Sequence, residues 1–240
     1  MPISSMDETL AHQTADTFDH VFTSDRNFYD RHYFNLHPKG GEFFLIIGMG
    51  QYPNLGTTDA FVCVSIDDTQ YVVRASRELD GDRIDTKVGP FGVEIVESLK
   101  QMRVWCDDNE HDVSFDLVFK GSSPVVEEPR TVIRRHRAIE MDVSRYTQAG
   151  TWSGKLNVAG KIINILHDDH LGVRDHSWGI RPIGETVAPG IKSKDFTDGY
   201  GFFHTWIPMQ FENYLLKLFV EENMKGERLV EESVRVNNFK

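Results

Sequence analysis

Hydrophobic and polar residues alternate with a period of two along most of this chain, which is the pattern of β-strands buried on one face. The alternation is clearest over residues 113–119, where Val, Phe and Leu interleave with Ser and Asp. Residues 43–49 are a continuous apolar run, which predicts a strand buried on both faces. Further strands are predicted at 60–66, 71–79, 93–98, 102–106, 141–152, 156–158, 162–166, 173–182, 201–209, 214–221 and 228–236.

Turn residues separate these strands, and no long helical pattern interrupts them. Asp67–Gln70 and Asp80–Asp82 are polar turns, and Ala159-Gly160 is a hairpin signal. Many short strands with this spacing predict an all-β sandwich or barrel. The run from residue 43 to residue 178 offers about eight or nine strands, enough for a barrel that holds one small ligand and leaves no exposed sheet edge.

Two short stretches combine histidine and tryptophan, and the first adds charge that a plain core strand would rarely contain. They are residues 173–182 and 202–207. Side chains on a strand alternate between two faces, so Arg174, His176 and Trp178 share one face of the first strand.

The second stretch repeats the order of histidine, hydroxyl residue and tryptophan, which places Phe202, His204 and Trp206 on one face. We predict that the two strands lie near one another and line one partly polar, partly aromatic cavity. A tryptophan beside charge or a chain-bending residue suits the mouth of such a cavity. The alternative is that the two histidines are hydrogen-bonded core residues.

Asp175 lies on the opposite face of its strand from His176, so a neighbouring arginine or a backbone amide is its expected partner. Two interpretations remain open. In the first, Asp175 and His176 belong to an acid/base site. In the second, Asp175 forms a buried ion pair with Arg181 or another arginine and holds one end of the barrel as a latch.

Composition excludes several partners. The net charge is −11, which argues against nucleic acid and anionic membranes but leaves a hydrophobic ligand open. No apolar run approaches the ~20 residues of a membrane helix, and residues 1–30 contain no signal peptide pattern. Cys63 and Cys106 are predicted to be buried free thiols, as expected of a cytoplasmic protein.

No metal or cofactor is predicted. His167 and His170 point to opposite faces if they lie on a strand, and the acids between them suit a solvated turn. The sequence has no phosphate-binding loop, nucleophile elbow or dinucleotide fingerprint. Residues 127–137 hold four arginines and a histidine, but neighbouring acids favour a solvated connection over a basic binding patch.

Residues 146–154 and 172–182 together resemble bacterial lipocalin-like proteins of the AttH and carotenoid-hydratase superfamily. The similarity is most specific over residues 145–185 and looser over 25–119. This resemblance implies two consecutive lipocalin-like antiparallel β-barrels and cofactor-free chemistry on hydrophobic substrates. Because family chains are longer, we expect a loose segment at 1–26, a barrel domain at 27–185, and a linker with a partial second β domain at 186–240.

The resemblance also implies a function. The superfamily includes hydratases and cyclases, so we expect a small terpenoid- or polyketide-like molecule to be bound and, in one interpretation, hydrated or cyclised. In that interpretation Asp175 or His176 is the acid, His204 orients water, and aromatic side chains stabilise a cation. The predicted ligand-binding residues are Tyr146, Arg174, Trp178, Arg181 and Trp206. The alternative is a non-catalytic carrier or structural barrel, with Asp175 as the latch.

Overall fold

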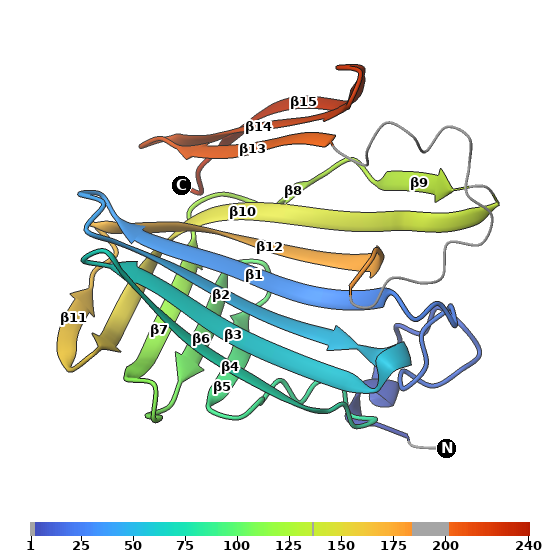
Figure 1. Cartoon of the computed structure of the whole chain (residues 1–240), viewed down its shortest axis with the longest axis horizontal. Helices are drawn as coiled ribbons and strands as arrows, with labels where there is room; N and C mark the ends of the chain where they lie inside the picture. Colours follow the sequence, from blue (N-terminus) through green and yellow to red (C-terminus); the bar gives the residue numbers. More distant parts are fainter. Residues whose placement is uncertain (1–2, 136, 184–201) are drawn as a thin grey trace.

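The computed structural model describes residues 3–135, 137–183 and 202–240. Within these residues the chain is nearly all β-structure (Figure 1). A large antiparallel sheet curls round on itself, and a small antiparallel sheet lies against its outer face. The prediction of an all-β, lipocalin-like fold is confirmed. No helix in this part of the chain has the length and apolar character needed to cross a membrane.

The large sheet has the strand order β4-β3-β2-β1-β12-β10-β7-β6-β5, and β8, β9 and β11 pair with β10. Its strands are β1 (Phe28–Pro38), β2 (Phe43–Tyr52), β3 (Thr57–Ile66), β4 (Thr69–Glu78), β5 (Phe91–Glu97), β6 (Gln101–Cys106), β7 (Val113–Gly121), β8 (Val126–Glu127), β9 (Thr131–Arg135), β10 (Ala138–Val158), β11 (Lys161–Ile165) and β12 (His170–Ile180). Two short 3-10 helices are η1 (Ser5–Glu8) and η2 (Pro53–Leu55).

The small sheet consists of β13 (Phe202–Gln210), β14 (Tyr214–Asn223) and β15 (Arg228–Asn237). It lies over the outer face of β10 and β12 (Figure 1). Val126, Ala149, Val173 and Leu215 form a buried apolar cluster there, against which Trp206 packs. The boundaries proposed for two domains remain a prediction, and most of the expected Gly- and Pro-rich loop at 183–198 lies outside the described residues.

The main core fills the inside of the curled sheet. Phe34, Phe119 and Trp152 meet there at ring distances of 5.1 to 6.5 Å, and all three are fully buried. The indole of Trp152 donates a hydrogen bond of 2.9 Å to the carbonyl of Asn35. Cys106 is buried as predicted, whereas Cys63 is only half-buried; both thiols are free.

The strand that supplies part of the candidate site is longer than the sequence pattern suggested. We predicted two separate strands at 141–152 and 156–158, but β10 runs without interruption from Ala138 to Val158. Glycine allows the strand to bend and stay paired. At Gly154, φ is +133° and a Cβ atom would lie 2.1 Å from the carbonyl oxygen of Asp116 on β7. Any other residue there would force these strands apart.

Candidate functional site

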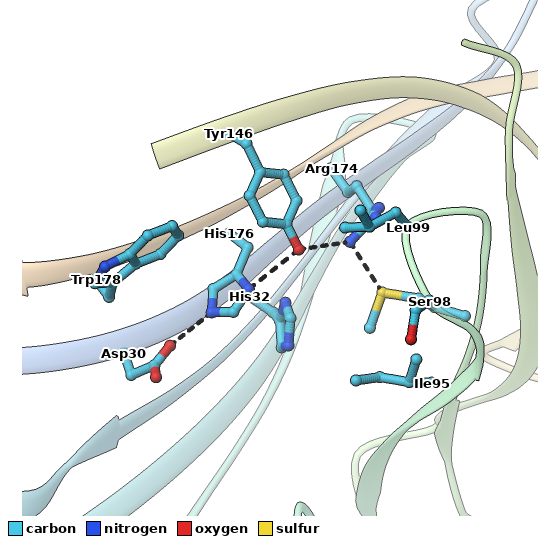
Figure 2. Close-up of a pocket in the computed structure, with 10 residues that line it drawn as sticks. Asp30, His32, Ile95, Ser98, Leu99, Tyr146, Arg174, His176 and Trp178 are labelled. Atoms are coloured by element: carbon cyan, nitrogen blue, oxygen red, sulfur yellow. Dashed lines mark hydrogen bonds and ion pairs between the residues drawn. The ribbon is translucent and has the colours of Figure 1, made fainter. Parts of the chain in front are cut away.

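A pocket of about 460 Å³ lies inside the curled sheet, between its central strands and the β5–β6 hairpin (Figure 2). One wall is polar and belongs to three adjacent strands. The opposite wall is largely apolar and belongs to the hairpin. The lining residues are Asp30 and His32 of β1, Tyr146 of β10, Arg174, His176 and Trp178 of β12, and Ile95, Ser98, Leu99 and Met102 of the hairpin.

Strand register explains why the polar residues meet. His176 of β12 lies directly opposite His32 of β1 on one side and Tyr146 of β10 on the other. Directly opposed residues in an antiparallel pair project from the same face of the sheet. Asp30 and Arg174 are two residues away from these pairs on their own strands, so they project from that face too.

Four of these side chains form one hydrogen-bonded row (Figure 2). Asp30 Oδ1 lies 2.6 Å from His176 Nε2, and His176 Nδ1 lies 3.2 Å from the hydroxyl of Tyr146. That hydroxyl lies 3.4 Å from Arg174 Nη1. A guanidinium can only donate and a carboxylate can only accept. The row is therefore satisfied when Arg174 donates to Tyr146, Tyr146 to His176 Nδ1, and His176 Nε2 to Asp30.

The carboxylate end of this row is held ionised. Burial alone would raise the pKa of Asp30, but its hydrogen bond from His176 and the positive charge of Arg83 outweigh burial and lower the pKa. Arg83 Nη2 lies 3.4 Å from Asp30 Oδ2. Asp30 is therefore a carboxylate at neutral pH, with a cation on the side away from the pocket's histidine.

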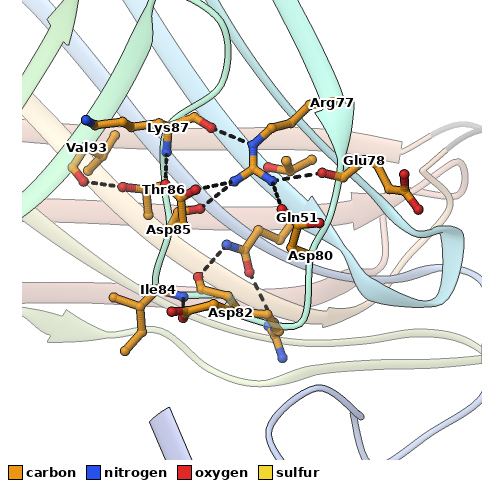
Figure 3. Close-up of polar contacts among 12 residues, drawn as sticks. Gln51, Arg77, Glu78, Asp80, Asp82, Ile84, Asp85, Thr86, Lys87 and Val93 are labelled. Carbon is orange, nitrogen blue, oxygen red and sulfur yellow. Dashed lines mark hydrogen bonds and ion pairs between the residues drawn. The ribbon is translucent and has the colours of Figure 1, made fainter. Parts of the chain in front are cut away.

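Arg83 belongs to the loop between β4 and β5, and Figure 3 shows how Arg77 holds this loop. Arg77 of β4 donates to the carbonyls of Lys87 and Asp85 in that loop, at 2.6 and 2.9 Å. Gln51 of β2 accepts from Arg83 Nε at 3.1 Å and donates to the Arg83 carbonyl at 2.7 Å. These contacts fix the loop against the barrel and so support Asp30 indirectly.

His32 completes the polar wall. Its ring centroid lies 4.3 Å from that of His176, and its Nδ1 is buried without a hydrogen-bond partner in the described residues. Burial lowers the pKa of His32 to about 3, and the repulsion that a protonated His32 would meet from a protonated His176 acts in the same direction. The ring is therefore neutral at physiological pH and adds no positive charge to the pocket.

The cationic end of the row lies deepest. Arg174 has only 2% of its surface exposed. Its Nε donates to Gln148 Oε1 at 2.8 Å, and the amide nitrogen of Gln148 donates in turn to the carbonyls of Leu99 and Ser123, both at 2.7 Å. Gln148 thus links Arg174 to the hairpin that forms the far wall of the pocket.

Four predicted site residues meet in this pocket: Tyr146, Arg174, His176 and Trp178. The prediction that Arg174, His176 and Trp178 share one face of β12 is confirmed. Trp178 is 38% exposed, and its ring centroid is 5.3 Å from that of His176. Their roles in catalysis or binding remain predictions.

The prediction that β12 and β13 line one cavity is wrong, because β13 belongs to the small sheet outside the barrel. His204 Nδ1 lies 2.9 Å from Glu221 of β14, and His204 is not among the lining residues of this pocket. Trp206 donates a hydrogen bond of 2.8 Å to Glu128. The repeated His-x-Trp spacing therefore recurs in two sheets without joining them in one pocket.

Asp175 and Arg181 lie on the outer side of the large sheet. Arg181 stacks over the ring of Tyr29 at 4.4 Å. Burial raises the pKa of Asp175 even though Arg145, Arg31 and Arg181 are near enough to oppose the shift. Within the described residues Asp175 has no ion pair inside 4 Å, so the expected pair with Arg181 is not formed.

A different carboxylate holds the outer face. Glu128, which we expected in a solvated connection, is only 4% exposed. It lies 3.3 Å from Arg145 and 3.4 Å from Lys217 of the small sheet, and it accepts hydrogen bonds from Thr147 and Trp206 at 2.5 and 2.8 Å. The connection is buried because the small sheet packs over it. We call Glu128, Arg145, Thr147, Trp206 and Lys217 the outer cluster.

Sequence reasoning missed Asp30 and His32, the two pocket residues of β1. The signal was present, because residues 28–34 mix aromatic, charged and histidine side chains as residues 173–182 do. The apolar wall from the β5–β6 hairpin had no comparable signal. Ile95 and Leu99 are ordinary apolar residues, and only the curling of the sheet brings them opposite β12.

Comparison with known proteins yields one family. A model of a family of unknown function (DUF8625) matches residues 3–238. A comparison with curated proteins found no match.

Solved structures share the fold at low identity. A Nitrosomonas europaea protein assigned as an AttH has a TM-score of 0.57 and 12% identity, covering 87% of this chain and 65% of its own. Kievitone hydratase from Nectria haematococca has a TM-score of 0.53 and 12% identity, and the match covers 86% of this chain and 60% of that protein. CghA has a TM-score of 0.51 and 9% identity, and the match covers 88% of this chain and 58% of that protein. This chain therefore spans about three fifths of each protein and shares the AttH-like, lipocalin-like fold.

Proposed function

The chain belongs to the DUF8625 family, a family of unknown function, and we propose that it binds a small, largely apolar molecule in the pocket of the curled sheet and transfers a proton to or from it. The observation that carries this proposal is the row of Asp30, His176, Tyr146 and Arg174 along one pocket wall.

The shape and lining of the pocket support a ligand of this kind. Its volume of about 460 Å³ lies within the range of small-molecule sites. Ile95, Leu99, Met102 and Trp178 supply apolar surface, and Ile95 and Leu99 remain 62% and 50% exposed at the rim. Exposed apolar side chains around a cavity gain free energy when an apolar molecule covers them.

The row supports proton transfer because it joins a proton acceptor to a proton donor. In a hydration, one carbon of a double bond gains a proton and the other gains hydroxide from water. One group must give a proton while another receives one. The row can accept the proton that water loses and deliver a proton to the carbon. The protein is therefore unchanged after each turnover.

Hydration is the reaction we favour within this class. Kievitone hydratase, a protein of the same fold, is a hydratase by name. The proposal needs no cofactor, and it assigns acid/base work to His176 and Tyr146 with Asp30 orienting the imidazole. His176 thus keeps the catalytic assignment made from the sequence. The carboxylate that we propose to act with it is Asp30 and not Asp175. The cytoplasm remains the expected location.

Binding can be tested with the ligand that the protein itself selects. We would record native mass spectra of the purified chain and extract bound molecules into organic solvent. Ile95→Trp should fill the pocket rim and abolish co-purification. The matched control is Val96→Trp, which alters the next residue of β5, is 51% exposed in the parent chain and is not a lining residue of the pocket.

Turnover is tested separately from binding. The extracted molecule would be incubated with the protein in deuterated water. Mass spectrometry would then show whether the molecule has added water or exchanged hydrogen for deuterium. We expect His176→Gln and Tyr146→Phe to bind the molecule but to lose the mass change. If the parent protein binds the molecule and never changes its mass, the carrier alternative replaces the enzyme.

A further inference from the structure

We infer that the ligand of this pocket carries an oxygen that is, or becomes, an anion, and that this oxygen binds the free Nη2 of Arg174. The group is a carboxylate, a phenolate or the enolate of a carbonyl. This inference rests on the proposed function, because it assigns a chemical class to the molecule bound in the same pocket.

The free donor is the first observation. Arg174 is 98% buried, since its exposed fraction is 2%. Its Nε and Nη1 have partners, but Nη2 is buried without a hydrogen-bond partner in the described part of the chain. A buried donor to which the protein offers no acceptor is costly, and such groups are usually satisfied by something bound.

The charge of Arg174 is the second observation. Its contacts are an amide oxygen, a phenol and the sulfur of Met102, with the rings of Phe119 and Tyr146 at 5.8 and 5.3 Å. No carboxylate among the described residues lies within 4 Å of it. Buried cations normally have a carboxylate partner, because the loss of hydration is otherwise uncompensated.

The other Lys or Arg that is fully buried in the described residues does have such partners. Lys217 of the outer cluster lies 2.5 Å from Glu232 and 3.4 Å from Glu128. Arg83, which is half-buried behind the polar wall of the pocket, pairs with Asp30. Arg174 is therefore a cation left for a ligand. Asp30 cannot serve it, because His176 and Tyr146 stand between them in the row (Figure 2).

The arrangement also fixes orientation and chemistry. An anionic oxygen would lie beside Arg174 and the Tyr146 hydroxyl, with the apolar body extending toward Trp178 at the pocket mouth. A guanidinium beside the reacting group stabilises negative charge and opposes a carbocation. Hydration in this pocket would then proceed on a double bond conjugated to a carbonyl, where proton transfer passes through an enolate.

The test uses two probes that share the same aromatic ring: naphthalene-2-carboxylate and the neutral 2-naphthalenemethanol. Calorimetry on the full chain at pH 7 should show the carboxylate binding roughly tenfold or more tightly, as expected for a charge-assisted hydrogen bond. Arg174→Met should bring the two affinities together. Arg103→Gln is the control, because this arginine follows Met102 but pairs with Asp116 on the outer surface, and it should leave the preference intact.

The outcomes separate this inference from the proposed function. Equal affinities for both probes in the parent protein would overturn the anion subsite and leave an apolar pocket. Binding of neither probe would overturn both proposals. If Arg174→Met does not fold, the affinities of the parent protein for the two probes still test the inference. Ile95→Trp, made as a single substitution in the parent, must then abolish carboxylate binding if the site is this pocket.

Discussion

The two faces of β10 and β12 each carry a group of charged side chains, and the two groups are built differently. Outside the barrel, Glu128 sits between Arg145 and Lys217 and also accepts two hydrogen bonds. Inside the barrel, Arg174 is buried beside a pocket of about 460 Å³, and no carboxylate of the described residues lies within 4 Å of it. Neighbouring residues of one strand thus contribute to one group whose opposite charges are paired and to one group whose cation has no ion pair among the described residues.

This difference separates structural charge from functional charge. A buried carboxylate that satisfies cations from two sheets holds those sheets together, and removing it leaves uncompensated charges. A buried cation that faces open volume instead keeps its interaction for a ligand, at some cost to stability. Four substitutions test this distinction, from the largest expected effect to the smallest.

Glu128→Gln should give the largest loss. The change keeps the shape of the side chain, but it removes the carboxylate that pairs with Arg145 among the described residues and one of the two carboxylates near Lys217. We expect a loss of about 3–5 kcal/mol in the free energy of unfolding, measured with urea at pH 7. Glu127→Gln, at the exposed neighbouring residue, is the control and should cost less than about 0.5 kcal/mol. A loss below about 1 kcal/mol for Glu128→Gln would show that the outer cluster does not hold the sheets.

His32→Phe should change the pH dependence of stability. In the unfolded chain His32 takes up a proton below about pH 6.5, whereas the folded pKa is about 3. The unfolded state therefore binds more protons between these values, and stability falls as the pH decreases through this window, by up to about 1.4 kcal/mol per unit.

Between pH 7 and pH 4.5, the His32→Phe variant should therefore lose about 2–3 kcal/mol less of its free energy of unfolding than the parent loses. Urea unfolding at several pH values measures the slope. His111→Phe, at a half-exposed surface ring, should leave the slope unchanged. Equal slopes for the parent and His32→Phe would mean that His32 is not held neutral in the pocket.

Arg174→Met should alter stability by no more than about 1 kcal/mol, although the residue is as buried as Glu128. The apolar side chain of similar length removes the cost of burying a charge without an ion pair, and this gain offsets the loss of the hydrogen bonds to Gln148 and Tyr146. Thermal and urea unfolding would be compared with the parent. A loss above about 3 kcal/mol would make Arg174 a structural residue and would remove the contrast between the two faces.

Asp175→Asn should have the smallest effect. Burial raises the pKa of this carboxyl, so folding disfavours its ionised form relative to the unfolded chain. The neutral amide should therefore change the free energy of unfolding by less than about 1 kcal/mol, or increase it slightly. A loss as large as that of Glu128→Gln would restore Asp175 as the latch.

The sequence predicted the strands well because each signal is local. Period-two alternation located β3, β7 and the hairpin at Ala159-Gly160, and it placed Arg174, His176 and Trp178 on one face. These features depend only on neighbours along the chain.

The site was predicted only in part, because it depends on which strands become neighbours. β1 pairs with β12 although 146 residues separate Asp30 from His176. Nothing local in the sequence states that pairing. The similar His-x-Trp spacing at His204 suggested a false partner, and the burial of Glu128 depends on the small sheet that packs over it.

The most direct test of the account is a crystal structure of the protein with naphthalene-2-carboxylate. We predict that the naphthalene ring lies between Trp178 and Leu99, with a carboxylate oxygen within hydrogen-bond distance of Arg174 Nη2. A carboxylate bound instead on the outer face, beside Arg145 or Arg181, with the inner pocket unoccupied, would contradict the assignment of the inner row to ligand chemistry.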